Sequence, residues 1–443
     1  MIALGLRLYG LDWDQGHLYH PDERAILMKV SDLHFPPINN LSTLLDAKES
    51  PLNPQWFPYG SLPLYLLETI QTVAGNWTNL DLFELRLPGR ALAALADTGT
   101  VVVLLCLGAT LYGRNVGLLA AGLLAVTVLH VQISHFFTVD PFMTFFAMLS
   151  LLFTARLMKK TSISNSAFAG IFLGLALACK ASAIALLFPL WVGHLLPLLA
   201  NNDQRIPFEA PSLNTLRRAI PGLVLDIVVG LAIFLLVWLF VNHAHDISTG
   251  IHALPSPTTT ASIIAIGAFL GLATIHILQA TTAKESGLIG NIIPPPLLGI
   301  LIAIGAGATA FFVTMPYAFL DWPSFFQDVG EQWQMSHRVL DYPYTRQYEN
   351  TTPYLYYIRQ LGLWGLGIPL ALTAGAGLAF SLWRGLRWGH RSDLLLLSFV
   401  VPIFVLIGGQ EVKFLRYLLP IIPLLVLMGA RMLFWLKIKA ISW

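Results

Sequence analysis

Apolar stretches long enough to cross a lipid bilayer recur along most of this chain, and they limit its fold more than any other feature. A helix needs about 20 consecutive apolar residues to cross the hydrocarbon core. Of the 443 residues, 56% are hydrophobic and only 11% are charged, which is more apolar surface than a soluble core of this size could bury. The sequence therefore predicts an all-α, polytopic membrane protein.

The same stretches give approximate positions for the membrane-spanning helices. Residues 1–11 are apolar but too few to cross, and they lack the basic start and cleavage site of a signal peptide, so we expect the tail of a truncated first helix. With that tail, the chain is predicted to contain about twelve transmembrane helices. The other spans are predicted at residues 88–111, 116–134, 141–158, 163–180, 183–199, 220–241, 261–281, 291–314, 361–383, 393–409 and 414–436.

The first long loop is expected to carry short helices at the membrane surface. Residues 12–58 are polar and rich in Pro and Asn, and a helix is predicted over 23–33. Residues 59–75 are apolar, but a proline and a glutamate interrupt them, which favours a helix lying along the bilayer surface. We expect one domain over 1–443, because the long outer loop at 315–360 has only about 45 residues, too few for a separate catalytic domain.

Basic residues predict which loops share one side of the membrane, since Lys and Arg are enriched on the cytoplasmic side. They cluster in alternate loops, for example at Arg156, Lys159 and Lys160. The remaining loops then share the outer face, and loops 12–87 and 315–360 are expected to carry the functional site. The full set of predicted outer loops is 12–87, 135–140, 242–260, 315–360 and 410–413.

Composition also argues against a nucleic-acid partner and against a special role for the two cysteines. A formal net charge of +2, with scattered basic residues, does not support a nucleic-acid partner. Cys106 and Cys179 both lie in apolar runs, where a thiol behaves as a small hydrophobic group, so neither a disulfide nor a metal site is predicted there.

Three charged residues and a histidine stand together in the first outer loop, in a chain that has few charges. They are His20, Asp22, Glu23 and Arg24. One interpretation is structural, because acidic residues are favoured at the start of a helix. The other is catalytic: Asp22 could take the proton from an acceptor hydroxyl as that oxygen attacks an anomeric carbon.

Further polar residues fall on the same predicted face. Asp140 precedes Pro141 at a helix start, where it could simply cap the helix or serve as a second catalytic carboxylate. Lys180 ends an apolar run and would cost about 2.5–3.5 kcal/mol at mid-membrane; it could extend to the interface or bind a lipid-linked phosphate. Phosphate recognition needs cations at that depth, and Arg24, Lys180, Arg346, Lys413 and Arg416 meet this requirement.

Short motifs along essentially the whole chain resemble bacterial GT-C membrane glycosyltransferases. Within this superfamily the sequence is most similar to the branch of protein O-mannosyltransferases and aminoarabinose transferases, also called phospholipid-carrier-dependent glycosyltransferases. The motifs are His20-Pro21-Asp22-Glu23, Thr138-Val139-Asp140-Pro141, the run from Gly174 to Lys180, Pro343-Tyr344-Thr345-Arg346-Gln347-Tyr348, Leu363-Trp364-Gly365-Leu366-Gly367 and Phe414-Leu415-Arg416-Tyr417-Leu418-Leu419-Pro420.

The resemblance implies a GT-C-type bundle and an inverting transfer of sugar from a polyprenyl-phosphate donor to a protein, lipid or glycan acceptor outside the membrane. It also implies a bacterial plasma-membrane protein with an outward-facing site. The catalytic set would be Asp22 as general base, Glu23 supporting the loop or the acceptor, and Asp140 as the second acidic position. The donor-phosphate set would be Arg24, Lys180, Arg346, Tyr348, Lys413 and Arg416.

No cofactor is predicted with certainty. Some GT-C enzymes use a divalent ion, and His20, Asp22 and Glu23 could supply ligands, but the sequence shows no dedicated metal-ligand spacing. The prediction is therefore no metal site. A transporter or flippase of lipid-linked sugars is the alternative function, since it would also need cations at the interface. Transporters of the common kinds have internal repeats, and none is seen here.

Overall fold

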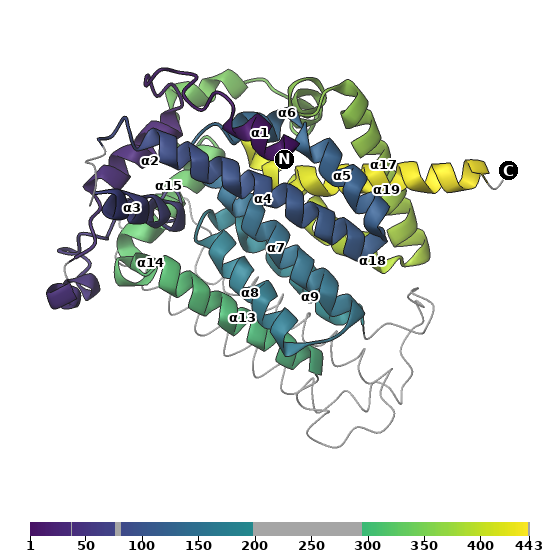
Figure 1. The fold of residues 1–443 in the computed structure, drawn as a ribbon, viewed down its shortest axis with the longest axis horizontal. Coiled ribbons are helices and arrows are strands. Elements are labelled where there is room, and N and C mark those ends of the chain that lie inside the picture. Colours follow the sequence, from purple (N-terminus) through teal and green to yellow (C-terminus); the bar gives the residue numbers. More distant parts are fainter. Residues whose placement is uncertain (37, 76–80, 198–294, 442–443) are drawn as a thin grey trace.

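The computed structural model describes residues 1–36, 38–75, 81–197 and 295–441. These residues form helices and loops without a strand, so the all-α prediction is confirmed (Figure 1). The predicted spans 220–241 and 261–281 and the loop 242–260 lie outside the described residues. The helices in the first half are α1 Ile2–Leu8, α2 Pro21–Asp32, η1 Ile38–Leu45, α3 Leu62–Ala74, α4 Arg86–Tyr112, α5 Arg114–Ala125, α6 Val128–Ile133, α7 Val139–Lys159, α8 Ile163–Leu177, η2 Ala181–Leu186 and α9 Leu187–Leu195.

The second half continues the bundle. It comprises α13 Pro295–Thr314, α14 Tyr317–Leu320, α15 Trp322–Ser336, η3 Pro343–Tyr348, α16 Leu355–Gln360, η4 Leu361–Gly365, α17 Ile368–Trp388, α18 Arg391–Gly408, η5 Leu415–Ile421 and α19 Ile422–Ile441. By length and composition, five described segments are apolar enough to cross a membrane: Arg86–Tyr112, Val139–Lys159, Pro296–Thr314, Arg391–Gly408 and Leu415–Ala440. The protein is an integral membrane protein of the polytopic class.

Some predicted spans are interrupted in the structure. The span predicted at 116–134 is two helices, α5 and α6, with Thr127 as the N-cap of the second. The segment 361–383 begins as a π-helical turn and restarts after Gly367, whose φ of 76° is a conformation that favours glycine. The last span begins with the 3-10 segment η5, which contains Pro420, a residue without an N–H for the helical ladder.

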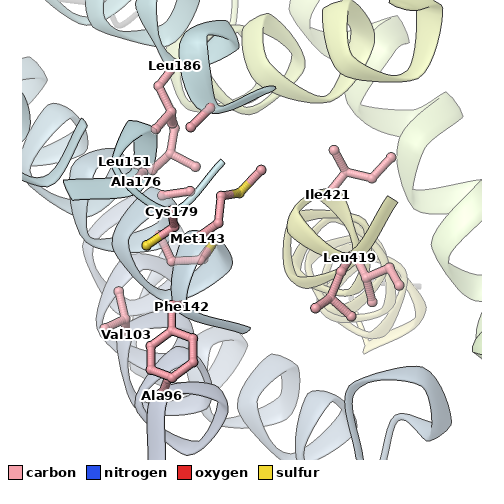
Figure 2. Packing of buried hydrophobic residues seen from close by; sticks show 14 of the residues in the cluster. Ala96, Val103, Phe142, Met143, Leu151, Ala176, Cys179, Leu186, Leu419 and Ile421 are labelled. Atoms are coloured by element: carbon pink, nitrogen blue, oxygen red, sulfur yellow. The ribbon is translucent and has the colours of Figure 1, made fainter. Parts of the chain in front are cut away.

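Helices α4, α7, α8 and α13 pack in sequence across the bundle (Figure 1), α4 against α7, α7 against α8, and α8 against α13. Apolar side chains fill the space between them. Figure 2 shows Ala96 and Val103 of α4, Phe142 of α7 and Ala176 of α8 within this cluster, with Leu419 of η5 facing them. The packing places the N-termini of α7 and η5 beside the end of α8, which positions the residues of the site.

Glycines allow the close approach of α8 and α13. A Cβ atom added to Gly170 would lie 1.9 Å from the Ala303 carbonyl oxygen, and one added to Gly174 would lie 2.1 Å from the Gly307 carbonyl oxygen. The spacing of four between Gly170 and Gly174 is the small-residue pattern that lets membrane helices pack with their backbones in contact. These two helices therefore depend on the absence of side chains at their interface.

Replacing Gly170 by alanine should lower the thermal unfolding midpoint of the detergent-solubilised protein. Its methyl group meets backbone atoms, which cannot move aside as a side chain would, and overpacking typically costs about 1–3 kcal/mol. Gly305→Ala on α13 is the matched control, because the methyl group added there would meet nothing within 4 Å and alanine favours helix. Equal midpoints for the two variants would contradict the proposed contact.

The short N-terminal helix is fixed by a buried ion pair. Arg7 of α1 is completely buried, and its Nε lies 2.6 Å from Oδ2 of Asp97 on α4. His130 Nδ1 of α6 lies 2.6 Å from the other Asp97 oxygen. The sequence predicts residues 1–11 only as the remnant of a span, whereas the structure shows that they form a docked element.

Candidate active site

The polar segment at residues 20–24 forms the start of α2, as the sequence predicted. His20 is the N-cap residue, its Nδ1 accepts a hydrogen bond from the Glu23 backbone N–H at 3.4 Å, and Pro21 occupies the first turn. Burial lowers the pKa of His20, against the opposing effect of the Asp22 carboxylate, which fits a neutral ring that accepts this bond. Capping is therefore done by His20, and the Asp22 side chain interacts elsewhere.

Four of the predicted residues form a continuous chain of alternating charges. Arg416 Nη2 lies 2.6 Å from Asp22 Oδ2, and Arg416 Nε lies 3.8 Å from Asp140 Oδ2. Lys180 Nζ donates a hydrogen bond to Asp140 Oδ1 at 2.7 Å. All four side chains are less than a fifth exposed, and Asp140 is only 4% exposed. Segments more than 390 residues apart in sequence thus meet at one point.

Local backbone structure explains why Asp140 and Lys180 face each other. Asp140 lies in the first turn of α7, whose N-cap is Thr138, and its carboxylate pairs with Lys180 at 2.7 Å. Lys180 stands in extended backbone between α8 and η2. The preceding residue accepts a hydrogen bond from the Gly60 backbone N–H at 2.9 Å, which ties the end of α8 to the outer loop.

Aromatic rings surround the two cations. Lys180 Nζ lies 4.4 Å from the centre of the Tyr417 ring, and the Arg416 guanidinium lies 4.5 Å from the Phe414 ring centre. Burial raises the pKa of Tyr59 well above its ordinary value, and the nearby Asp22 carboxylate raises it further, so this phenol stays protonated. Cation–π contacts stabilise both cations and limit their contact with water.

A second, fully buried charge cluster supports the loop that carries Asp22. Arg90 of α4 donates hydrogen bonds to Glu23 at 2.8 and 2.7 Å and to Asp14 at 2.9 and 2.6 Å. All three side chains have no exposed surface. Glu23 Oε1 also accepts a hydrogen bond from the Phe137 backbone N–H at 2.9 Å. Glu23 is thus a buried link between the start of α2 and the loop before α7.

A largely apolar cavity of about 700 Å³ opens beside the charge chain. Lys180, Tyr59 and Tyr417 line it on the side of the charges. Most of the remaining lining is apolar, with side chains such as Phe311 of α13 and Phe325 of α15, and a few polar residues, among them Gln332 and Gln410, complete it. A cavity with the Lys180 cation at one boundary and mostly apolar walls beyond suits a ligand that joins an anionic head to a hydrocarbon tail.

The other predicted phosphate contacts do not join the chain of alternating charges. Arg24 is exposed on α2, and Arg346 is exposed on η3 and pairs with Asp341 at 2.8 Å. Lys413 is buried, which lowers its pKa, and its Nζ donates to the Glu411 carbonyl oxygen at 3.0 Å. Tyr348 is buried edge-to-face against Phe414, which itself stacks on Arg416.

The side chains that the sequence offered as metal ligands have other partners. Glu23 is bound by Arg90 and Phe137, His20 Nδ1 accepts from the Glu23 backbone, and Asp22 pairs with Arg416. Within the described part of the chain, no group of three or more His, Cys, Asp or Glu residues is arranged to hold a metal ion.

Three residues of the site were not predicted from the sequence. Arg90 and Asp14 anchor Glu23, and Tyr59 lines the cavity beside the charges. Arg90 could have been found, because a charge inside a predicted span demands a partner. Asp14 and Tyr59 carry no such signal, since polar and aromatic residues are ordinary in an outer loop.

Part of the chain matches the model of a known protein family. Residues 82–238 match the family model described as dolichyl-phosphate-mannose-protein mannosyltransferase. The matched range contains Arg90, Asp140 and Lys180, and it begins after Asp22. No curated protein sequence matches the chain.

Solved oligosaccharyltransferase structures share the fold. The archaeal oligosaccharyltransferase AglB from Archaeoglobus fulgidus, in complex with an inhibitory peptide and a dolichol-phosphate, has 16% identity and a TM-score of 0.50 over 86% of this chain and 43% of its own. The apo form of the Archaeoglobus fulgidus oligosaccharyltransferase has 14% identity and a TM-score of 0.53, over 97% and 49%. ArnT from Cupriavidus metallidurans bound to undecaprenyl phosphate has 15% identity and a TM-score of 0.47, over 97% and 58%.

The chain spans just under half the length of the two oligosaccharyltransferases and somewhat more than half the length of ArnT. At these identities the likeness concerns the fold. The all-helical bundle, the match to the protein mannosyltransferase model and the fold of the oligosaccharyltransferases agree with the resemblance seen in the sequence motifs. Residues 82–238 thus match the protein mannosyltransferase model, and the described part of the chain has the fold of these membrane oligosaccharyltransferases.

Proposed function

We propose that this protein transfers a sugar from a polyprenyl-phosphate donor to an acceptor on the extracytoplasmic side of the membrane, with inversion at the anomeric carbon. The observation that supports this most is the chain of Asp22, Arg416, Asp140 and Lys180 at the boundary of an apolar cavity. It combines a carboxylate for proton removal, cations for a phosphate and an apolar space for a lipid tail.

In this mechanism Asp22 acts as general base. An acceptor hydroxyl attacks the anomeric carbon, its proton passes to the Asp22 carboxylate, and the bond between that carbon and the phosphate oxygen breaks. Polyprenyl phosphate leaves with the bonding electrons. A positioned base of this kind contributes about 10²–10⁴-fold to the rate. Arg90 holds the buried Glu23 side chain through two hydrogen bonds. Because Glu23 directly follows Asp22, it would act as a positioning residue for the base.

Arg416 and Lys180 would stabilise the phosphate. Hydrogen bonds from cations to phosphate oxygens are about twice as strong as neutral ones, and both cations are already desolvated by aromatic rings. Asp140 lies within reach of both, at 3.8 Å from Arg416 and 2.7 Å from Lys180, and it would hold them at the correct separation.

The proposal is tested by incubating purified protein in membranes with a panel of polyprenyl-phosphate sugars. We expect release of polyprenyl phosphate that depends on both the sugar donor and an acceptor fraction from the cell envelope. Movement of the intact lipid-linked sugar across a vesicle, without cleavage, would instead identify a transporter or flippase.

Replacing Lys180 by methionine should weaken polyprenyl-phosphate binding by about tenfold, which corresponds to about 1.4 kcal/mol. Methionine keeps an unbranched apolar side chain but loses the ammonium group, which lies 4.4 Å from the centre of the Tyr417 ring. Affinity would be measured by competition with a fluorescent polyprenyl phosphate in nanodiscs. Lys437→Met, at an exposed position near the end of α19, should leave affinity unchanged; equal affinity in both variants would remove Lys180 from the phosphate site.

A further inference from the structure

Arg416, the cation proposed to bind the donor phosphate, already forms an ion pair with Asp22. Its guanidinium lies 2.6 Å from the Asp22 carboxylate, and the ring of Phe414 lies against one face. The side chain is 13% exposed, so few directions remain for a new partner. Arg416 Nε is also buried without a hydrogen-bond acceptor among the described residues, although Asp140 lies 3.8 Å away. One N–H of this cation is therefore available and desolvated.

We infer that Asp22 and the donor phosphate compete for Arg416, so that donor binding loosens the ion pair that holds Asp22. This inference rests on the proposed function and adds an order of events to it. A phosphate at Arg416 draws the guanidinium toward its own oxygens, and the Asp22 carboxylate is released to accept a proton from an acceptor hydroxyl. The base then becomes available only when the donor is in place.

The charges of the four residues support this coupling. Two carboxylates and two cations sum to zero, so an added phosphate makes the cluster negative. Lys180 has a second partner in Asp140 at 2.7 Å, and Asp140 is almost fully buried. Asp22 is the more exposed of the two carboxylates, 19% against 4%. Asp22 is consequently the carboxylate that can turn toward water when its partner is taken.

This device links donor binding to release of the base. Arg416 holds the Asp22 carboxylate while no donor is bound, and a donor phosphate cannot bind fully until the pair opens. The ion pair thus lowers donor affinity in the same step in which it restrains the base. Removing Asp22 should therefore strengthen donor binding while it abolishes transfer, a combination that a simple binding role for Asp22 does not predict.

The test measures the affinity of undecaprenyl phosphate for the full chain in nanodiscs. We expect Asp22→Asn to bind it about five- to tenfold more tightly than the unchanged protein, the effect of removing one partly buried ion-pair competitor. Asp12→Asn is the matched control: it removes a carboxylate from the same loop that pairs with Arg86, and it should leave affinity unchanged. Weaker or equal binding by Asp22→Asn would overturn the inference.

A double-variant cycle separates competition for Arg416 from a general charge effect. In the Arg416→Gln background, Asp22→Asn should no longer tighten binding, because the shared partner is gone. The same gain in both backgrounds would contradict the inference and point to long-range electrostatics. If the unchanged protein does not bind undecaprenyl phosphate at all, the proposed function fails as well. If it binds but Asp22→Asn gives no gain, only the competition is wrong.

Discussion

Asp22→Asn should reduce the rate of sugar transfer at least about 100-fold, the lower end of what a general base contributes. Asparagine has the same shape as aspartate and can remain in the first turn of α2 but cannot accept a proton. The measurement is single-turnover release of polyprenyl phosphate at saturating donor. Because the helix is capped by His20, the loss should be chemical and not structural.

Two controls make this result specific. Asp12→Asn changes an acid in the same loop that pairs with Arg86, and it should retain full turnover. Thermal unfolding of Asp22→Asn should match that of the unchanged protein within a few degrees. Full turnover by Asp22→Asn would exclude Asp22 as the base, and Asp140 would then be the remaining carboxylate of the charge chain.

Arg90→Met should have the largest effect on stability. The substitution leaves Glu23 and Asp14 as two buried carboxylates without their partner, and breaking a buried ion pair from one side costs about 3–5 kcal/mol. We expect a large fall in the unfolding midpoint, which would be measured by thermal denaturation of the protein in detergent. The start of α2 should also lose its fixed position, so transfer should fall together with stability.

The matched control for this variant is Arg114→Met, an arginine at the exposed start of α5. It should change the midpoint little. The double variant Arg90→Met with Glu23→Gln should recover part of the lost stability, because it removes one of the two uncompensated charges. A midpoint for Arg90→Met equal to that of Arg114→Met would show that the buried cluster is not a structural anchor.

The helices were predictable where periodicity and length carry the information. The span at 88–111 appears as α4 and that at 141–158 as α7, and the short helix at 23–33 appears as α2. Breaks such as the one between α5 and α6 were not predictable, because an unbroken apolar run carries no signal for a local interruption. Such breaks arise from packing with residues far away in the chain.

Part of the charge chain could also be predicted. A charge at the edge of a membrane requires an explanation, which pointed to Asp22, Asp140, Lys180 and Arg416 together. The partners themselves could not be read from the sequence, because each ion pair joins segments separated by at least 40 residues. For the same reason the pairing of Glu23 with Arg90 could not be predicted, because the two residues lie 67 positions apart.

The hydrogen bonds of Glu23 help to fix the distance between the carboxylates of Asp22 and Asp140. Glu23 directly follows Asp22, and its side chain accepts the backbone N–H of Phe137, three residues before Asp140. The separation of the two acids is thereby determined by one side chain and a few peptide units. The long stretch of chain between them, including all of α3 and α4, does not have to define that distance.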